Sequence, residues 1–116
     1  MLDFFEPILV ERINQKITKR QASLISPDNF GSWNSTLPYL SSVQLQISCV
    51  VRSIIKNHYF SDGNKRTATI VLVSLCLTFG LKKPKKNIDV EILKIAEGNY
   101  SIEQVCSILF KNEKRD

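Results

Sequence analysis

Apolar residues recur every three to four positions along most of this chain, which is the spacing of helices that turn one face to a core. The pattern predicts five helices, over about residues 7–20, 39–57, 65–79, 90–97 and from 101 to about 110. The first helix is expected to turn Ile8, Val10, Ile13 and Ile17 inward. Gln104, three residues after Ser101, predicts a capping box where the last helix starts.

The segment 65–79 is apolar on nearly every side. Its β-branched run Thr69-Ile70-Val71 would suit a buried strand, but the segment is too long for one and ends at Gly80, as a helix does. We therefore expect a helix that is buried all round and forms the centre of the fold.

Residues 22–38 interrupt the helical pattern with turn-forming Ser, Asn, Pro and Gly residues. This segment also carries Phe30 and Trp33, the only tryptophan. The aromatic rings either anchor the segment to the core or contact a partner. We expect a flap, as a loop or a short hairpin, before the long second helix.

The length of 116 residues with 43% hydrophobic residues predicts a single domain over 1–116 with a real core. No apolar stretch is long enough for a membrane span, and the first residues do not resemble a secretion signal. The three cysteines are widely spaced among apolar residues, which favours reduced core thiols, no zinc site and a cytoplasmic location.

The net charge of +5 suggests an anionic partner without identifying it. Four lysines surround Pro84 in the segment 82–86, which predicts an exposed loop that is either simply solvated or faces an anion. The sequence shows neither a recognition helix nor an aromatic platform, so we do not expect nucleic acid as the partner.

Reactive side chains gather in the segment 58–66, between the second and third predicted helices. His58 is the only histidine, and histidine exchanges a proton near neutral pH, so it is the candidate general base. Asp62 offers the hard oxygen ligand that Mg²⁺ uses beside phosphates.

The rest of this segment predicts an anion site at a helix start. Gly63 and Asn64 suit a tight turn, and the backbone N–H groups that follow point out of the helix end. Lys65 and Arg66 are unfavourable at the positive end of a helix unless an anion lies between them and the amides. A phosphate or a nucleotide is the expected ligand.

The segment 58–66 resembles the Fic/Doc signature, His-x-Phe-x-(Asp/Glu)-(Gly/Ala)-Asn-(Gly/Lys)-Arg, at every constrained position. The choice of Asp and Lys, followed by Thr67-Ala68, resembles the death-on-curing (Doc) branch more than the classical Fic branch. The order of elements is similar from about residue 22 to residue 111. The resemblance implies an all-α Fic fold, a compact helical bundle around a buried central helix.

The resemblance also implies ATP and Mg²⁺ as cofactors and a protein hydroxyl as the acceptor. By this resemblance, His58 is the general base and Asp62 is the Mg²⁺ ligand. Phe60 anchors the loop, and Gly63 and Asn64 form an anion nest. Lys65 and Arg66 bind the phosphates and compensate charge in the transition state.

Two departures from the classical Fic pattern favour the Doc branch. Lys65 replaces a glycine beside the diphosphate, and Thr69 replaces a second arginine. Classical Fic proteins transfer AMP to Ser, Thr or Tyr, whereas Doc-type toxins phosphorylate a threonine of elongation factor Tu and stop translation. Both departures favour transfer of the γ-phosphate.

The Fic inhibitory pattern, (Ser/Thr)-x-x-x-Glu-(Gly/Asn), is incomplete here. Glu97-Gly98 is present, but position 93 is leucine, so we expect a helix end and inhibition by a separate antitoxin chain. The alternatives are a Fic-type AMP transferase and a non-catalytic binding module on the same fold.

Overall fold

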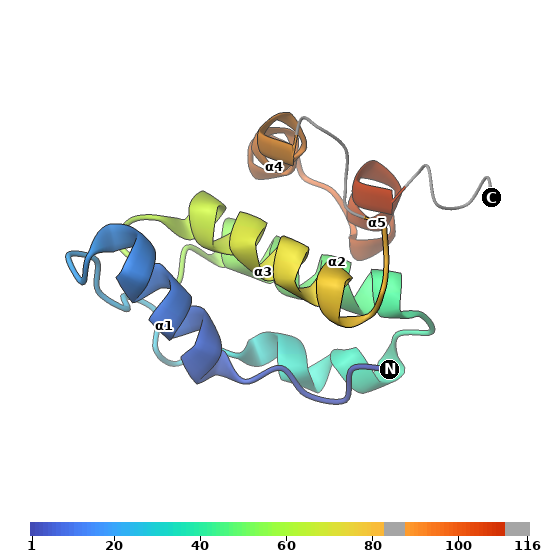
Figure 1. Ribbon diagram of the computed structural model, residues 1–116, viewed down its shortest axis with the longest axis horizontal. Helices are drawn as coiled ribbons and strands as arrows, with labels where there is room; N and C mark the ends of the chain where they lie inside the picture. The colour runs from blue at the N-terminus through green and yellow to red at the C-terminus, as the bar shows by residue number, and fades with distance from the viewer. Residues whose placement is uncertain (83–87, 111–116) are drawn as a thin grey trace.

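A computed structural model describes residues 1–82 and 88–110 (Figure 1). These residues form five α-helices and two short 3-10 helices. In chain order they are α1 (Pro7–Thr18), η1 (Ser32–Ser35), η2 (Leu37–Tyr39), α2 (Val43–Asn57), α3 (Asn64–Thr78), α4 (Ile88–Glu97) and α5 (Ile102–Phe110). The all-α fold is confirmed.

Helix α2 lies at the centre of the bundle and packs against α3, α4, α5 and η1. Figure 1 shows α4 and α5 on one side of the α2–α3 pair, and α1 with the 3-10 helices on the other. The apolar stripe predicted for the second helix is buried from Ile47 onward, including Ile54 and Ile55. Each such side chain contributes roughly 1.5–3 kcal/mol through burial.

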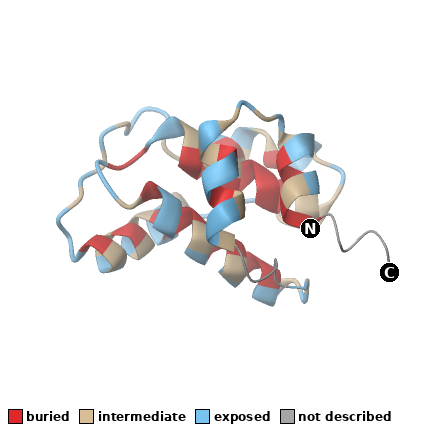
Figure 2. Cartoon of the chain, turned by 90° about the horizontal axis from the view of Figure 1, so that it is seen from above, coloured by how far each residue is buried: buried red, intermediate tan, exposed pale blue. Residues whose placement is uncertain are grey.

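The expectation that the third helix is buried all round was wrong. Ile70 and Leu77 of α3 are exposed, because α1, α2 and α4 cover only part of its surface. Figure 2 shows the resulting division of the helices into buried and exposed sides. The central position belongs to α2.

The inner face of α1 also differs from the prediction. Its buried residues are Val10, Asn14 and Thr18, whereas Ile8 is exposed and Ile13 is half-buried. Two of the three buried positions are thus polar, and both lie behind the loop that follows α2.

Two helix starts show how side chains set the boundaries. Helix α2 begins at Val43 and not near Tyr39, because Ser42 caps it by accepting a hydrogen bond from the Leu45 N–H at 3.1 Å. The predicted capping box is confirmed, since the backbone N–H groups of Gln104 and Ser101 bond each other's side chains at 3.1 and 2.8 Å.

The flap over 22–38 is a loop with 3-10 turns and not a hairpin, since the described residues contain no strand. Trp33 is 1% exposed and donates its indole N–H to the Phe5 carbonyl at 2.9 Å. The ring is therefore a core anchor, as one of the two alternatives predicted. Apart from Lys82, the predicted lysine loop lies outside the described residues.

Cys49, Cys76 and Cys106 are buried and form no disulfide, in agreement with their prediction as core thiols. Burial raises the pKa of the Cys49 thiol, and the positive charge of Arg52 opposes this shift. Within the described ranges, no helix combines the length and apolar character that a bilayer span requires.

Candidate active site

The loop between α2 and α3 begins at His58, the residue that ends α2. Its backbone is left-handed, with φ 46° and ψ 57°. This conformation turns the chain sharply away from the helix axis and leaves the His58 side chain exposed. A non-glycine residue in this region carries strain, which is found frequently at functional sites.

A pocket of about 320 Å³ brings most of the predicted site residues together. Its lining consists of Ile55, His58, Ser61, Asp62, Gly63, Asn64, Lys65, Arg66 and Ala96. Phe60 does not line the pocket. A larger pocket of about 500 Å³ lies between α5 and the start of α2, but Glu103 is its only charged lining residue. The reactive groups therefore mark the smaller pocket as the candidate site.

The floor of this pocket is the start of α3. Gly63 precedes the helix with φ 77°, no side chain caps the helix, and its first turn contains no acidic residue. The first N–H groups of a helix have no partner within it, and the helix dipole adds partial positive charge there. Lys65 and Arg66 are exposed in the same turn. This end of α3 is suited to bind an anion.

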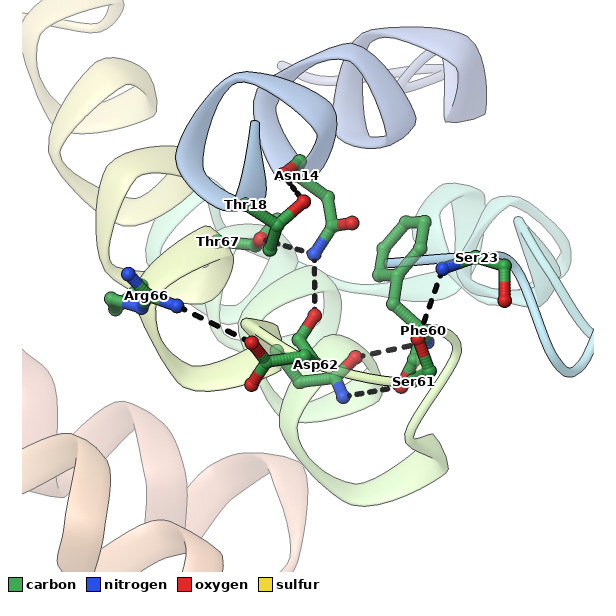
Figure 3. Close-up of polar contacts among 9 residues, drawn as sticks. Asn14, Thr18, Ser23, Phe60, Ser61, Asp62, Arg66 and Thr67 are labelled. Atoms are coloured by element: carbon green, nitrogen blue, oxygen red, sulfur yellow. Dashed lines mark hydrogen bonds and ion pairs between the residues drawn. The ribbon is translucent and has the colours of Figure 1, made fainter. Parts of the chain in front are cut away.

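Asp62 and Arg66 form an exposed ion pair at 3.7 Å, with side chains 73% and 60% accessible (Figure 3). A pair so exposed adds little to stability. Each side chain can therefore leave the other for a stronger partner, the guanidinium for a phosphate and the carboxylate for a cation.

A divalent cation fits this site only together with phosphate ligands. The described residues contain no group of three His, Cys, Asp or Glu side chains that could hold a metal alone. Mg²⁺ is usually held by one or two carboxylates, waters and the phosphates of its nucleotide. Asp62 supplies one such carboxylate beside the anion site.

The loop is fixed by Phe60 and Asn64. Phe60 is 2% exposed, and its ring packs edge-on against Phe30 with centroids 5.5 Å apart. The Asn64 side chain accepts from the Phe60 N–H at 3.1 Å and donates to the Phe60 carbonyl at 2.8 Å. The Asn64 side chain thus fixes the loop through two bonds to the Phe60 backbone.

The flap holds the loop from a second side. The N–H groups of Ser61 and Ile25 donate to the carbonyls of Ser23 and Tyr59 at 2.9 and 2.8 Å, which places Leu24 opposite Phe60. The Ser23 N–H also donates to Ser61 Oγ at 2.9 Å (Figure 3).

Asn14, which the sequence did not single out, contacts the loop from α1. Its side-chain amide donates to the Asp62 carbonyl and to Thr67 Oγ1. A β-carbon at Gly63 would lie 2.8 Å from Thr18 Cγ2 and 3.1 Å from Asn14 Nδ2, so α1 leaves space for glycine alone unless a neighbour moves. Asn14 lies four residues after Val10 and shares its side of α1, but its polar side chain gave no reason to expect burial there.

The family model described as Fic/DOC family matches residues 7–76. This chain belongs to the Fic/DOC family. The match includes α1, the flap, α2, the whole loop and most of α3, and it leaves α4 and α5 outside. It therefore begins earlier and ends earlier than the similarity predicted over about 22–111.

No curated protein and no solved structure matches the chain significantly. Fic/DOC proteins are commonly transferases that act on proteins and use nucleotide substrates. The family match does not distinguish the Fic branch from the Doc branch.

Proposed function

We propose that this chain is a Doc-like protein kinase, which transfers the γ-phosphate of ATP to a hydroxyl of a target protein. The observation that carries the proposal is the pocket at the start of α3, where His58 and Asp62 lie with Lys65 and Arg66 around an uncapped helix end. A base, a metal ligand and fixed positive charge are the groups that phosphoryl transfer needs.

In the proposed reaction, the His58 imidazole accepts the proton of the target hydroxyl. The hydroxyl oxygen then forms a bond to the γ-phosphorus, the bond from that phosphorus to the β–γ bridging oxygen breaks, and ADP leaves. Lys65 and Arg66 would compensate the charge that develops on the phosphate oxygens. Mg²⁺, held by Asp62 and the phosphates, would neutralise part of the triphosphate charge.

Two side chains favour γ-phosphate transfer over AMP transfer. Lys65 lines the pocket, where its volume and charge would lie beside the phosphates of a bound nucleotide. Thr69, where classical Fic proteins have a second arginine, donates its hydroxyl to the Lys65 carbonyl at 3.0 Å. The Thr69 side chain is thus neutral and bonded to its own helix, and it offers no second cation for an AMP-transfer geometry.

We also propose that the chain is the toxin of a toxin–antitoxin pair, that a translation factor such as elongation factor Tu is its target, and that it acts in the cytoplasm. These points rest on the resemblance to the Doc branch. One structural observation supports control by a separate chain. Glu97 ends α4 and lines a different pocket, with Leu93, so it does not occupy the proposed nucleotide site.

The experiment that tests the proposal supplies Mg²⁺, the candidate target and ATP labelled at either the α- or the γ-phosphate. We expect label from the γ-phosphate only, and none with His58→Ala. Label from the α-phosphate would establish the AMP transferase instead. No label from either, with wild type equal to His58→Ala, would leave a non-catalytic binding module.

Lys65→Gly tests the assignment of the branch in the same assay. Removing this side chain should lower γ-label transfer by about tenfold, because one phosphate-binding cation is lost. It should also open space for the classical AMP-transfer geometry. If neither product changes, Lys65 does not determine the branch.

A further inference from the structure

Asn14 supports the loop from the side away from the pocket. It lies on α1, none of whose residues lines the pocket, and its side chain is 1% exposed. Its amide Nδ2 donates to the Asp62 backbone carbonyl at 2.8 Å and to Thr67 Oγ1 at 3.2 Å. Figure 3 shows one of these bonds running down from Asn14 to Asp62 and the other running sideways to Thr67.

The bond to Asp62 also sets the direction of the next amide. The described residues contain no cis peptide bond, and in a trans peptide the carbonyl and the N–H point in opposite directions. Because the Asp62 carbonyl points to Asn14 on α1, the Gly63 N–H points away from α1. Gly63 lines the pocket, so this amide is directed to the side where the anion would bind.

The Asp62 carbonyl requires a hydrogen-bond donor at position 14. A backbone carbonyl only accepts, so an amide NH₂ satisfies it and a carboxylate of the same shape does not. The backbone of α1 is itself tied at this point, since Thr18 Oγ1 donates to the Asn14 carbonyl at 2.8 Å. The backbone that carries the Asn14 amide is therefore held in place while the amide donates to the loop.

We propose that Asn14 is a positioning residue of the phosphate site, which holds the Asp62 carbonyl against α1 and so aims the Gly63 N–H and the first turn of α3 at the phosphates. The inference rests on the proposed function. It adds a residue from outside the signature loop and gives α1 a role in that function.

The test measures the affinity of the folded protein for inorganic tripolyphosphate, by calorimetry, in wild type, Asn14→Asp and Asn14→Ala. Tripolyphosphate lacks the nucleoside and reports on the phosphate site alone. We expect both variants to bind about tenfold more weakly, the loss of one well-directed bond to a charged group.

The matched control is Gln46→Leu. Gln46 is also a buried amide, 1% exposed, and it bonds the backbone of Leu2 and Leu37 far along α2 from His58. This variant should lose stability and keep the wild-type affinity for tripolyphosphate. If Asn14→Ala loses stability but binds tripolyphosphate as wild type does, Asn14 is only structural and the proposal is overturned.

If both Asn14 variants fail to fold, Thr67→Val decides the matter, because it keeps the side-chain shape and removes the second bond that orients the Asn14 amide toward the Asp62 carbonyl. We expect affinity about threefold weaker, and an unchanged affinity overturns the proposal. A wild-type protein that binds no tripolyphosphate would instead refute the proposed function, which is a distinguishable result.

Discussion

At the scale of single residues, the loop depends on backbone conformations that most side chains avoid. His58 and Gly63 both have positive φ, 46° and 77°. Gly63 adopts this conformation with little strain, whereas for His58 the conformation is unfavourable by roughly 1–2 kcal/mol. Selection for stability alone would place glycine at a left-handed helix end. His58 therefore lies at a position where glycine would stabilise the fold, as Lys19 does at the end of α1.

This strain predicts the behaviour of His58→Gly. The variant should unfold in urea with a free energy about 1 kcal/mol higher than wild type, because glycine adopts the left-handed region without strain. It should also transfer no phosphate, because the base is gone.

Lys19→Gly is the control for this trade between stability and activity. Lys19 ends α1 in the same conformation, with φ 56°, and it does not line the pocket. The Lys19→Gly variant should show a similar increase in the free energy of unfolding and should transfer phosphate as wild type does. If His58→Gly retained wild-type transfer, the assignment of the base would be wrong.

At the scale of elements, α2 and α3 build the site from opposite ends. Helix α2 delivers His58 at its C-terminus, and α3 delivers its uncapped N-terminus with Lys65 and Arg66. Ser42 caps the other end of α2, about 24 Å from His58 at a rise of 1.5 Å for each residue.

Ser42→Ala should therefore lower the free energy of unfolding by about 1 kcal/mol, as loss of a cap does, and leave phosphate transfer unchanged. Urea unfolding and the transfer assay measure the two effects. Ser35→Ala is the control, because its exposed hydroxyl bonds only within η1 and caps no α-helix. If Ser42→Ala and Ser35→Ala had the same free energy of unfolding, the assignment of Ser42 as the helix cap would be wrong.

The helices and the spacing of the site residues could be predicted because both are properties of local sequence. The 3.6-residue period predicted α2, and the reactive residues of the segment 58–66 line one pocket because they are close together in the sequence. The start of α2 was misplaced because Pro38 supports a 3-10 helix, which the apolar period does not distinguish from the start of an α-helix. Which sides of an apolar helix are covered depends on its neighbours, so Ile70 of α3 could not be recognised as exposed.

Asn14 shows the limit of the sequence at the site itself. A lone asparagine on a helix gives no sign of its partners, and Asp62 is 48 residues away along the chain. Only the packing of α1 on α3 brings them together. The isoleucines of the first helix also suggested a different inner face, which concealed the buried row of Val10, Asn14 and Thr18.

At the scale of the whole molecule, the pocket lies where several helices converge. The Lys56 ammonium of α2 donates to the carbonyls of Ala96 and Gly98 at 3.2 and 2.7 Å and so holds the end of α4. Ala96 then closes one wall of the pocket. A chain of net charge +5 surrounds this site, which favours the approach of a polyanion such as ATP at low ionic strength.

Binding of nucleotide phosphates at the start of α3 can be followed residue by residue, through amide chemical shifts during a titration with ATP and Mg²⁺. We expect saturable shifts that are largest for the backbone N–H groups of residues 62–66, reproduced by tripolyphosphate and strongly reduced in Arg66→Ala. Shifts confined to the larger pocket between α2 and α5, or no saturable shift at residues 62–66, would contradict phosphate binding at the start of α3.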